Sequence, residues 1–428
     1  MLGKNKLKDT RTFSITTLGC KVNRYESDKI RELLLSAGFD EAGEDEPADL
    51  HVVNTCTVTH IADRKSRQKL RQAIRLNPGG RIIVTGCAAS NKSSGLEEIE
   101  GDFLVVPNKD KGKFAEIVKG LFPDLALPWN HEIPPGSRNR AFLKTGDGCE
   151  HFCTYCIVPH VRGPLTSRPL QELLDEADSL VDSGCREIVL TAIHLGAYGH
   201  GLDGGENLAM LLDRLASAHP EVRFRISSVE PVDFSKDVIE VMRIHPGICR
   251  HIHLPLQHAS DRILRRMNRD YLKDDFRGIV SGIRSIIPDM AVTADVIVGF
   301  PGETDEDFRE LVDFVREMRF YRCHVFKYSR RKGTPAFSFP DQVPDSVKQA
   351  RSAELISVSS ELSESFNRSL VGSVCDILVE EKSGGFWTGL SSGYVRARFK
   401  SDSAAVNDIV RVRVTGGDSE GVWGEALL

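Results

Sequence analysis

Three cysteines lie close together in one glycine-flanked stretch, GDGCEHFCTYCIVPHVRG, where Cys149, Cys153 and Cys156 follow a C-x3-C-x2-C spacing. Soft thiolates select zinc, copper(I) or iron-sulfur clusters, and a closed structural site takes four protein ligands. Three thiolates therefore predict a 4Fe-4S cluster with one iron open to a small molecule. The alternative is a structural zinc site completed by His151 or His160, although structural zinc ligands are typically spaced as two pairs.

Three further cysteines each close a strand-like run, namely ITTLGC, HVVNTC and IIVTGC, which end at Cys20, Cys56 and Cys87. The carboxyl ends of neighbouring parallel strands share one edge of a sheet, so these thiols can converge. Gly19 and Gly86 precede two of them and would let the backbone approach a cluster closely. A single cysteine of this kind would more typically be a packed core residue than a metal ligand. The set predicts a second 4Fe-4S cluster with an open iron. The remaining cysteines show no such pattern and are expected to be structural: Cys185, Cys249, Cys323 and Cys375.

The composition bounds what the chain can be. Its 428 residues, 40% of them apolar, suffice for two or three domains with their own cores. Ten cysteines in a reducing compartment favour metal or redox chemistry over a disulfide framework. The N-terminal stretch lacks an apolar signal segment, and no run of about 18 apolar residues could span a bilayer, so we expect a cytoplasmic protein without a membrane partner. A net charge of −5 means that local basic patches would have to hold any nucleic acid.

The elements that must position the thiols form three predicted domains of an α/β protein. Residues 1–128 alternate strand-like and helical runs, which predicts an open parallel sheet. Residues 135–366 contain six strand-helix units, which predict a partial (β/α)6 TIM-like barrel. Residues 367–428 contain short strands with glycine-rich turns, which predict a small all-β barrel. A Pro- and Gly-rich linker is expected near residues 127–140.

The first cysteine triplet, with Tyr155 before its last member, resembles the signature of radical S-adenosylmethionine enzymes. The resemblance implies that the open iron binds the amino and carboxylate groups of S-adenosylmethionine and that electron transfer yields a 5'-deoxyadenosyl radical. The stretch DVIVGFPGET resembles the family's late-strand glycine motif, which implies that Gly299 and Gly302 lie near the adenine. Three polar residues at or after strand ends suit the ribose and methionine moiety, or equally a rim or core hydrogen bond: Glu230, Gln257 and Arg266.

Both triplets and the C-terminal β module together resemble the methylthiotransferase family over nearly the full length. The resemblance implies an enzyme that inserts sulfur and a methyl group into a C–H bond, with S-adenosylmethionine as both methyl donor and radical source. It implies that the six cysteines are the catalytic, metal-binding residues and that the C-terminal module corresponds to a TRAM domain. An electron donor such as flavodoxin or ferredoxin is expected as a partner.

The motif around Cys20 predicts the substrate. It reads TLGCKVNRYESD, which is similar to the MtaB-type group and its CKVN-x-YE pattern. Lys21, Val22 and Asn23 carry this resemblance, which implies methylthiolation of the 2-position of N6-threonylcarbamoyladenosine beside the anticodon of tRNA. The alternatives within the family are isopentenyladenosine in tRNA and an aspartate of a ribosomal protein. Asn23 and Asn54 are candidates to orient substrate or cluster, although an Asn after a strand is often a turn residue.

Basic patches independently favour an RNA substrate. The helical run IADRKSRQKLRQAIR has six basic residues against a lone Asp63, the run YVRARFK puts its basic side chains on one strand face, and FKYSRRKGTPA adds a third patch. From Arg368 onward, however, seven Lys and Arg stand against eight Asp and Glu, which leaves a protein substrate arguable. The candidate substrate-binding residues are Arg64, Arg67, Arg71, Lys327, Arg330, Arg331, Arg396, Arg398 and Lys400.

Two other classes of protein could carry these cysteines. An iron-sulfur RNA-binding protein without catalysis is one alternative, although binding alone does not need an open iron at two sites. Zinc-stabilised RNA binding is another, and it predicts tetrahedral zinc and a colourless protein.

Overall fold

The computed structural model describes residues 11–125 and 139–427, and these fall into two compact units. Within the described residues, the smaller unit contains 11–125 together with Cys156–Pro164 and Arg331–Gly333, and the larger unit contains the rest. Most of the linker expected near 127–140 lies outside the described residues. In the part of the chain that is described, no helix combines the length and apolar character needed to cross a membrane.

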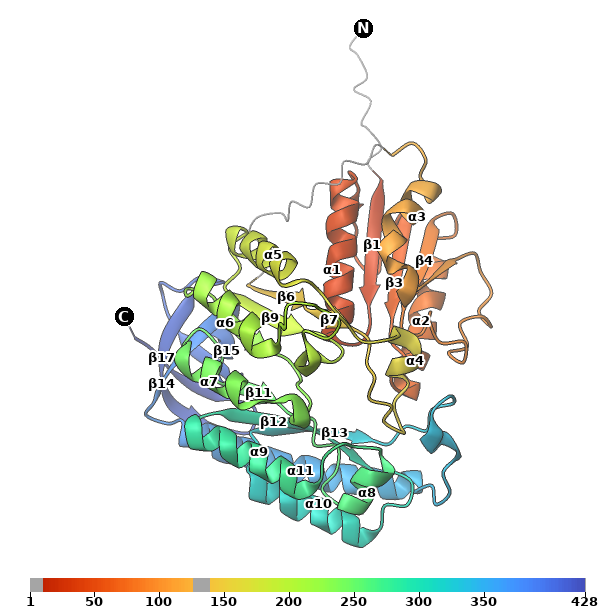
Figure 1. The fold of residues 1–428 in the computed structure, drawn as a ribbon. Helices are drawn as coiled ribbons and strands as arrows, with labels where there is room; N and C mark the ends of the chain where they lie inside the picture. Colours follow the sequence, from red (N-terminus) through yellow and green to blue (C-terminus); the bar gives the residue numbers. More distant parts are fainter. Residues whose placement is uncertain (1–10, 126–138, 428) are drawn as a thin grey trace. The chain divides into compact units, whose positions relative to one another are not determined.

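The smaller unit contains an open sheet with the strand order β2-β1-β3-β4-β5, and all of its strand pairs are parallel. This confirms the predicted sheet, while the short edge strands β2 and β5 were not predicted. Its elements, shown in Figure 1, are β1 (Thr12–Thr17), α1 (Lys21–Ser36), β2 (Asp40–Glu41), β3 (Leu50–Thr55), α2 (His60–Leu76), β4 (Arg81–Gly86), β5 (Leu104–Pro107), η1 (Asn108–Lys113), α3 (Phe114–Leu121) and α4 (Val158–Arg162).

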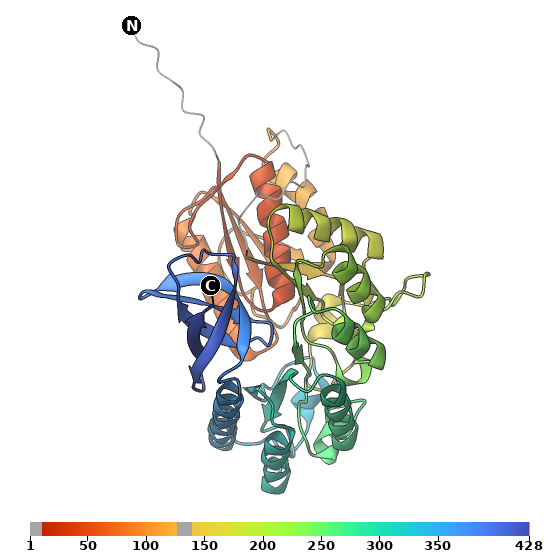
Figure 2. The same ribbon diagram turned by 90° about the vertical axis from the view of Figure 1, so that its left-hand side faces the viewer.

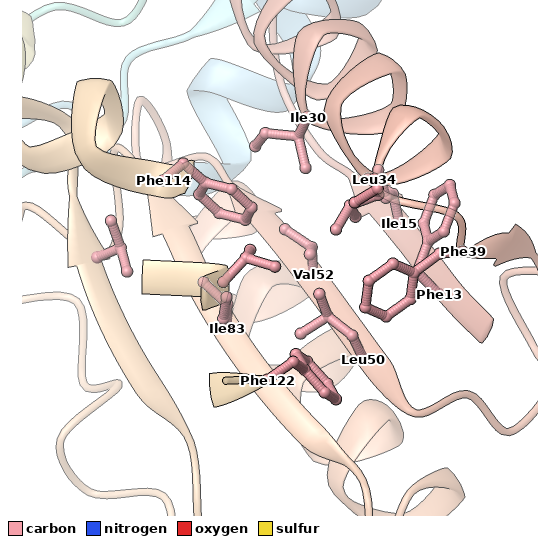
Figure 3. Packing of buried hydrophobic residues seen from close by; sticks show 13 residues of the cluster. Phe13, Ile15, Ile30, Leu34, Phe39, Leu50, Val52, Ile83, Phe114 and Phe122 are labelled. Carbon is pink, nitrogen blue, oxygen red and sulfur yellow. The ribbon is translucent and has the colours of Figure 1, made fainter. Parts of the chain in front are cut away.

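One face of this sheet packs against α1 and α3. Apolar side chains alternate along β1 and β3, so Phe13, Leu50 and Val52 point into the same layer as Leu34 from α1 (Figure 3). The core also contains edge-to-face aromatic pairs, with ring centroids of Phe39 and Phe122 5.3 Å apart. This packing holds the carboxyl ends of β1, β3 and β4, where the cysteines are, on a rigid support.

Six parallel strands in the larger unit form two three-stranded sheets, in the orders β6-β9-β10 and β11-β12-β13. A parallel bridge between Ser228 and His253 continues the pairing from one sheet to the next. This is the predicted partial barrel, with strands at the predicted places (Figure 1). The strands are β6 (Arg140–Lys144), β9 (Glu187–Thr191), β10 (Arg223–Ile226), β11 (His251–His253), β12 (Ala291–Val298) and β13 (Arg322–Lys327).

Helices follow these strands, as expected of β/α units. Their apolar faces are buried, as with Phe308, Leu311 and Phe314 on α10. The helical elements are α5 (Leu170–Asp182), η2 (Leu195–Ala197), α6 (Leu208–Ala218), η3 (Pro231–Asp233), α7 (Lys236–Ile244), α8 (Asp261–Arg266), α9 (Lys273–Ile286), α10 (Asp305–Met318), η4 (Pro335–Ser338) and α11 (Asp345–Ser369).

The C-terminal residues form a closed barrel with the strand order β14-β15-β16-β18-β17, drawn in blue in Figure 2. Closure removes the free strand edges that could pair with another chain. The closing strand β18 was not predicted, and it pairs parallel to β16 and antiparallel to β17. The strands are β14 (Val374–Ser383), β15 (Phe386–Ser391), β16 (Arg396–Lys400), β17 (Ile409–Gly417) and β18 (Val422–Ala426).

Buried arginines of the partial barrel hold the C-terminal barrel in place. Arg225 on β10 donates from Nη1 to the carbonyl oxygen of Ser392 at 3.0 Å and from Nη2 to that of Ser391 at 3.1 Å. The same guanidinium forms a two-point ion pair with Glu187, at 2.8 and 2.9 Å. Arg140 adds a second cation at 2.6 Å from Glu187. The larger unit therefore contains a buried carboxylate between two arginines.

We expect Glu187→Gln to lower the free energy of unfolding by about 3–5 kcal/mol, because the buried Arg225 and the partly exposed Arg140 would lose a buried carboxylate. Burial alone would raise the pKa of Glu187, but Arg225 and Arg140 lower it to about 2. Since the folded pKa lies below the ordinary value of 4.5, the ion pair stabilises the wild-type fold above that pH, and this stability is lost as the pH falls toward 2. Chemical denaturation across this pH range would measure both effects.

A matched control is Glu240→Gln, which removes an exposed carboxylate 2.5 Å from Arg243 and is expected to unfold like the wild type. Equal stability of the Glu187 and Glu240 variants would contradict the structural role of the buried pair.

Candidate functional site

The first cysteine triplet lies in a single loop between β7 (Gly146–Asp147) and α4. Strand β7 pairs with β8 (Thr166–Ser167), which ties the start of this loop to the chain that follows it. These three cysteines are not joined in disulfides; Cys153 is buried, whereas Cys149 and Cys156 are partly exposed. The loop thus offers three thiolate ligands without a fourth cysteine in the motif.

Arg269 is the cation of this site. Its Nη1 donates to Sγ of Cys153 at 3.1 Å and lies 3.5 Å from the hydroxyl of Tyr155, while its Nη2 forms an ion pair with Glu230. Burial raises the pKa of the Cys153 thiol, and the charge of Arg269 opposes that rise. A guanidinium at this distance favours the thiolate that a metal requires. Glu230 therefore positions a cation at the cysteine loop.

His194 is a second charged group beside the same loop. Its Nε2 lies 2.5 Å from Oδ2 of Asp233 and 3.3 Å from Nε2 of His151. Burial alone would lower the pKa of His194, but hydrogen bonds to Asp233 and Cys149 raise it to about 10. The ligand atoms of His151, His194 and Asp233 lie within 4.8 Å of one another, so these three side chains could also hold a metal ion.

The glycine motif after β12 forms a turn held by Glu303. The backbone N–H groups of Gly299 and Phe300 donate to Oε2 of Glu303 at 2.7 and 3.2 Å, and Arg351 donates to Oε1 at 2.7 Å. Gly299 has φ of 73°, and a Cβ there would lie 2.2 Å from a side-chain carbon of Lys348. Only glycine fits both the conformation and the space, so Gly299 lets the side chain of Lys348 pack against the turn.

Arg266 borders this turn. An ideal Cβ at Gly302 would lie 3.4 Å from Nε of Arg266, whose guanidinium stacks 4.9 Å from the ring centre of Phe339. Among the described residues, its buried Nε and Nη2 have no hydrogen-bond partner. Buried donors normally have partners, so these two nitrogens can accommodate an anionic ligand group. Gln257 instead uses its backbone in the sheet, where its N–H donates to Asp295 at 2.8 Å.

The second triplet is brought together at the carboxyl ends of three adjacent strands. Cys56 directly follows β3, Cys87 directly follows β4, and Cys20 is the N-cap residue of α1 after β1. Cys56 and Cys87 are buried and Cys20 retains exposed surface. Loss of solvation raises the pKa of the Cys20 thiol and raises that of Cys56 to about 11, and the neighbouring Cys87 adds to both. The three thiols thus lie within electrostatic reach of one another.

Two glycines make this convergence possible. They were expected to let the backbone approach a cluster, and in the structure they pack against the end of the neighbouring strand. Gly19 has φ of 105°, and a Cβ there would lie 2.9 Å from Cβ of Cys56. Gly86 has φ of 93°, and a Cβ there would lie 2.3 Å from the carbonyl oxygen of Thr55. Both glycines therefore let neighbouring strand ends approach each other at the cysteines.

Asn23 and Asn54 are buried beneath the second triplet. Nδ2 of Asn23 donates to the carbonyl oxygens of Leu18 and Thr55 at 2.7 and 2.9 Å. Nδ2 of Asn54 donates to the carbonyl oxygen of Asn23 at 2.9 Å and to Oγ of Ser27 at 3.0 Å. These bonds join the strand ends to α1, which begins at Lys21 and thus includes the KVN motif in its first turn. A direct substrate contact by either amide stays a prediction.

The basic candidates on α2 and on the C-terminal barrel are largely exposed. Arg64 and Arg71 face solvent, whereas Arg67 donates to the carbonyl oxygen of Ser94 at 2.6 Å. On β16 the alternation is as predicted, because Val395, Ala397 and Phe399 are buried and the basic residues between them are exposed. The exposed residues of that strand are Arg396, Arg398 and Lys400.

The third basic patch contains both exposed and buried side chains. Lys327 and Arg330 are exposed, with Lys327 donating to Gln349 at 2.7 Å. Arg331 is buried, where it forms an ion pair with Asp63 and donates to Oγ1 of Thr57 at 2.7 Å. In this structure its charge is neutralised, so it offers no exposed cation to a substrate. Asp63, the lone acidic residue of the basic helical run, is the buried partner of this ion pair.

Three residues that contact the cysteines or the glycine turn were not identified from the sequence. They are Arg269, which contacts Cys153, Arg162, which contacts Cys87, and Glu303, which contacts Gly299. Arg269 stands among other arginines in LRRMNR, and only the turn after α8 distinguishes it. Glu303 could have been noticed, because it follows the second glycine of the late-strand motif. Arg162 closes the stretch that begins with the first triplet, and its position there was the available signal.

Family models match two parts of the chain. Residues 143–315 match the radical SAM superfamily, and residues 12–106 match the uncharacterized protein family UPF0004. These matches contain the first and the second cysteine triplet, respectively.

Several curated proteins are similar over nearly the whole chain. A threonylcarbamoyladenosine tRNA methylthiotransferase MtaB of Bacillus subtilis is 38% identical, covering 94% of this chain and 93% of that relative. A protein of the same name from Chlamydia pneumoniae is 36% identical, covering 97% and 98%. A tRNA-2-methylthio-N(6)-dimethylallyladenosine synthase of Thermotoga petrophila is 35% identical, covering 86% of each chain.

Solved structures share the fold at low sequence identity. The radical S-adenosylmethionine methyltransferase TsrM from Kitasatospora setae, solved with cobalamin and a [4Fe-4S] cluster bound, aligns with a TM-score of 0.57 at 15% identity. The alignment covers 76% of this chain and 77% of that one. It supports the arrangement of the strands and helices described above.

Proposed function

The chain belongs to the radical S-adenosylmethionine tRNA methylthiotransferases, and we propose that it methylthiolates the 2-position of N6-threonylcarbamoyladenosine beside the anticodon of tRNA. The observation that carries the proposal is the pair of cysteine triplets, one in the loop after β7 and one at the ends of β1, β3 and β4. The substrate is supported by the names of the relatives from Bacillus subtilis and Chlamydia pneumoniae and by the CKVN motif.

Family membership implies one 4Fe-4S cluster and S-adenosylmethionine, and the first triplet has the donor chemistry to hold that cluster. When bound, the cluster supplies the electron that cleaves S-adenosylmethionine. Arg269 stabilises the Cys153 thiolate, and His194, which pairs with Asp233, adds positive charge near Cys149. Arg266 has two buried nitrogens without a partner among the described residues, which could bind an anionic group of the cofactor, and the adenine is proposed to lie near Gly299 and Gly302.

The second triplet is proposed to hold a second 4Fe-4S cluster with an open iron. Cys20, Cys56 and Cys87 converge without a fourth cysteine, which is the same donor count as in the first site. Their partly buried position limits water at the cluster, and the exposed Cys20 leaves one side accessible. Two open clusters would separate the formation of the radical from the delivery of sulfur and of the methyl group.

The tRNA would be bound by the exposed basic residues of each part. In this proposal, residues 1–128 form the domain of the second cluster, residues 135–366 the radical domain, and residues 367–428 a TRAM domain. The face of β16 suits a phosphate backbone, because Arg398 and Lys400 are exposed and lie 5.1 Å from the ring centres of Trp423 and Phe386. Aromatic rings fix these cations on the strand and offer flat surfaces to bases.

The test is nucleoside mass spectrometry of tRNA after anaerobic incubation with reconstituted protein, reductant, sulfide and S-adenosylmethionine. We expect the 2-methylthio derivative to form on tRNA that carries threonylcarbamoyladenosine. A parallel reaction with tRNA that carries isopentenyladenosine should yield no product. If product formed only in that parallel reaction, isopentenyladenosine would be the substrate instead. If 5'-deoxyadenosine formed without either product, both tRNA substrates would be refuted.

A further inference from the structure

A buried ionic cluster lies directly beside the second cysteine triplet. We name it the Arg162 cluster; it consists of Arg162, Glu26, Asn23 and Lys111, and all four belong to the smaller unit. The side chain of Arg162 is 0% exposed. Its Nε donates to Sγ of Cys87 at 3.3 Å, its Nη1 donates to Oε1 of Glu26 at 2.6 Å, and its Nη2 donates to Oδ1 of Asn23.

The three contacts fix the guanidinium in one orientation. Glu26 and Asn23 both come from the buried side of α1, and the helix therefore presents them together. Since arginine remains protonated in proteins, the group at the Cys87 sulfur is a permanent cation and a directed N–H donor. A hydrogen bond to a charged acceptor is shorter and stronger than one to a neutral acceptor. The geometry thus suits a thiolate better than a neutral thiol.

Two largely buried cations share one carboxylate in the Arg162 cluster. Glu26 is shared by two cations, because Lys111 forms an ion pair with its other carboxylate oxygen. Lys111 is also 3.5 Å from Oδ1 of Asn54, beneath the same strand ends. Burying surplus positive charge is costly unless an anion lies close by. Arg162 also donates to the sulfur of Cys87, so a thiolate there places a negative charge beside the two cations.

We propose that Arg162 is a positioning residue that holds Cys87 as a thiolate ligand and raises the reduction potential of the cluster at Cys20, Cys56 and Cys87. The proposal rests on the proposed function, which places a cluster at these three thiols. Reduction adds negative charge to the cluster, and a fixed cation and N–H···S hydrogen bonds stabilise that charge. Asn108 provides a second, weaker donor to the same sulfur at 3.8 Å.

The test measures the cluster's midpoint potential, independently of turnover. The full chain carrying Cys149→Ala, Cys153→Ala and Cys156→Ala would contain the second cluster only, and its EPR signal would be titrated against potential. Arg162→Gln in this background is expected to shift the midpoint to more negative values, and Arg162→Lys to shift it less. Glu26→Gln removes the counter-charge and is expected to shift it to more positive values.

Opposite signs for the Arg162 and Glu26 variants would support the proposal, and Glu26→Gln provides a readout even if Arg162→Gln fails to fold. The matched control is Arg81→Gln, an exposed arginine at the start of β4 in the same unit, which should leave the midpoint unchanged. An unchanged midpoint in the Arg162 and Glu26 variants, with iron fully loaded, would overturn this inference alone. Absence of iron from the triple variant with Arg162 intact would overturn the proposed second cluster, and this inference with it.

Discussion

Cys149→Ala is expected to abolish the reductive cleavage of S-adenosylmethionine. The first site has three thiolates for a cluster that needs all of them, so loss of one leaves an iron without a protein ligand. The effect should exceed the ~100-fold that loss of an outer-shell partner costs. The measurement is 5'-deoxyadenosine formed anaerobically with reductant, together with the iron content.

Cys375→Ala is the matched control for Cys149→Ala. It also removes a partly exposed free thiol from the larger unit, and the structure places it on β14 of the C-terminal barrel. Its 5'-deoxyadenosine yield should equal that of the wild type. Wild-type yield from the Cys149 variant would contradict the assignment of the first cluster.

Cys20→Ala is expected to have an equally large effect on a different product. Methylthiolated nucleoside should be lost, because the proposed second cluster would lose one of its three ligands. Some cleavage of S-adenosylmethionine should remain, because Cys149, Cys153 and Cys156 are intact. Measuring 5'-deoxyadenosine and methylthiolated nucleoside in one reaction separates the two functions.

The Cys20 variant also tests the second site against a structural role. Cys20 is an N-cap residue without a side-chain capping bond and keeps exposed surface, so alanine there should cost little folding stability. Full methylthiolation by a Cys20 variant would show that the second-cluster assignment is wrong. Loss of both products together with loss of the folded state would instead identify Cys20 as structural.

The strands and the cysteine positions could be predicted because local patterns determine them. Apolar runs such as HVVN and IIVT have the composition of buried parallel strands, and the residue after such a strand lies at the edge of the sheet. The position of Cys56 and Cys87 at neighbouring strand ends follows from this rule. The alternation in YVRARFK similarly predicted which side chains of β16 are exposed.

The cations at the thiols could not be predicted, because they depend on contacts between distant parts of the chain. Arg162 meets Cys87 across 75 positions of sequence, and Arg269 meets Cys153 across 116. Arg269 closely follows Arg265 and Arg266 in the sequence, so residue type alone does not single it out. Arg331 is the opposite case. The sequence placed it in a basic patch for substrate, whereas in the structure it is buried and ion-paired with Asp63.

The hydrogen bonds that attach the C-terminal barrel have a consequence for how such a protein can evolve. Arg225 and Arg223 donate to main-chain carbonyls of the barrel, at Ser391, Ser392, Leu390 and Asp376. The backbone carbonyl group is the same in every residue, whatever its side chain. Most substitutions in the barrel therefore leave these hydrogen bonds unchanged. The outer face of the barrel can therefore diversify toward new partners while its attachment remains constant.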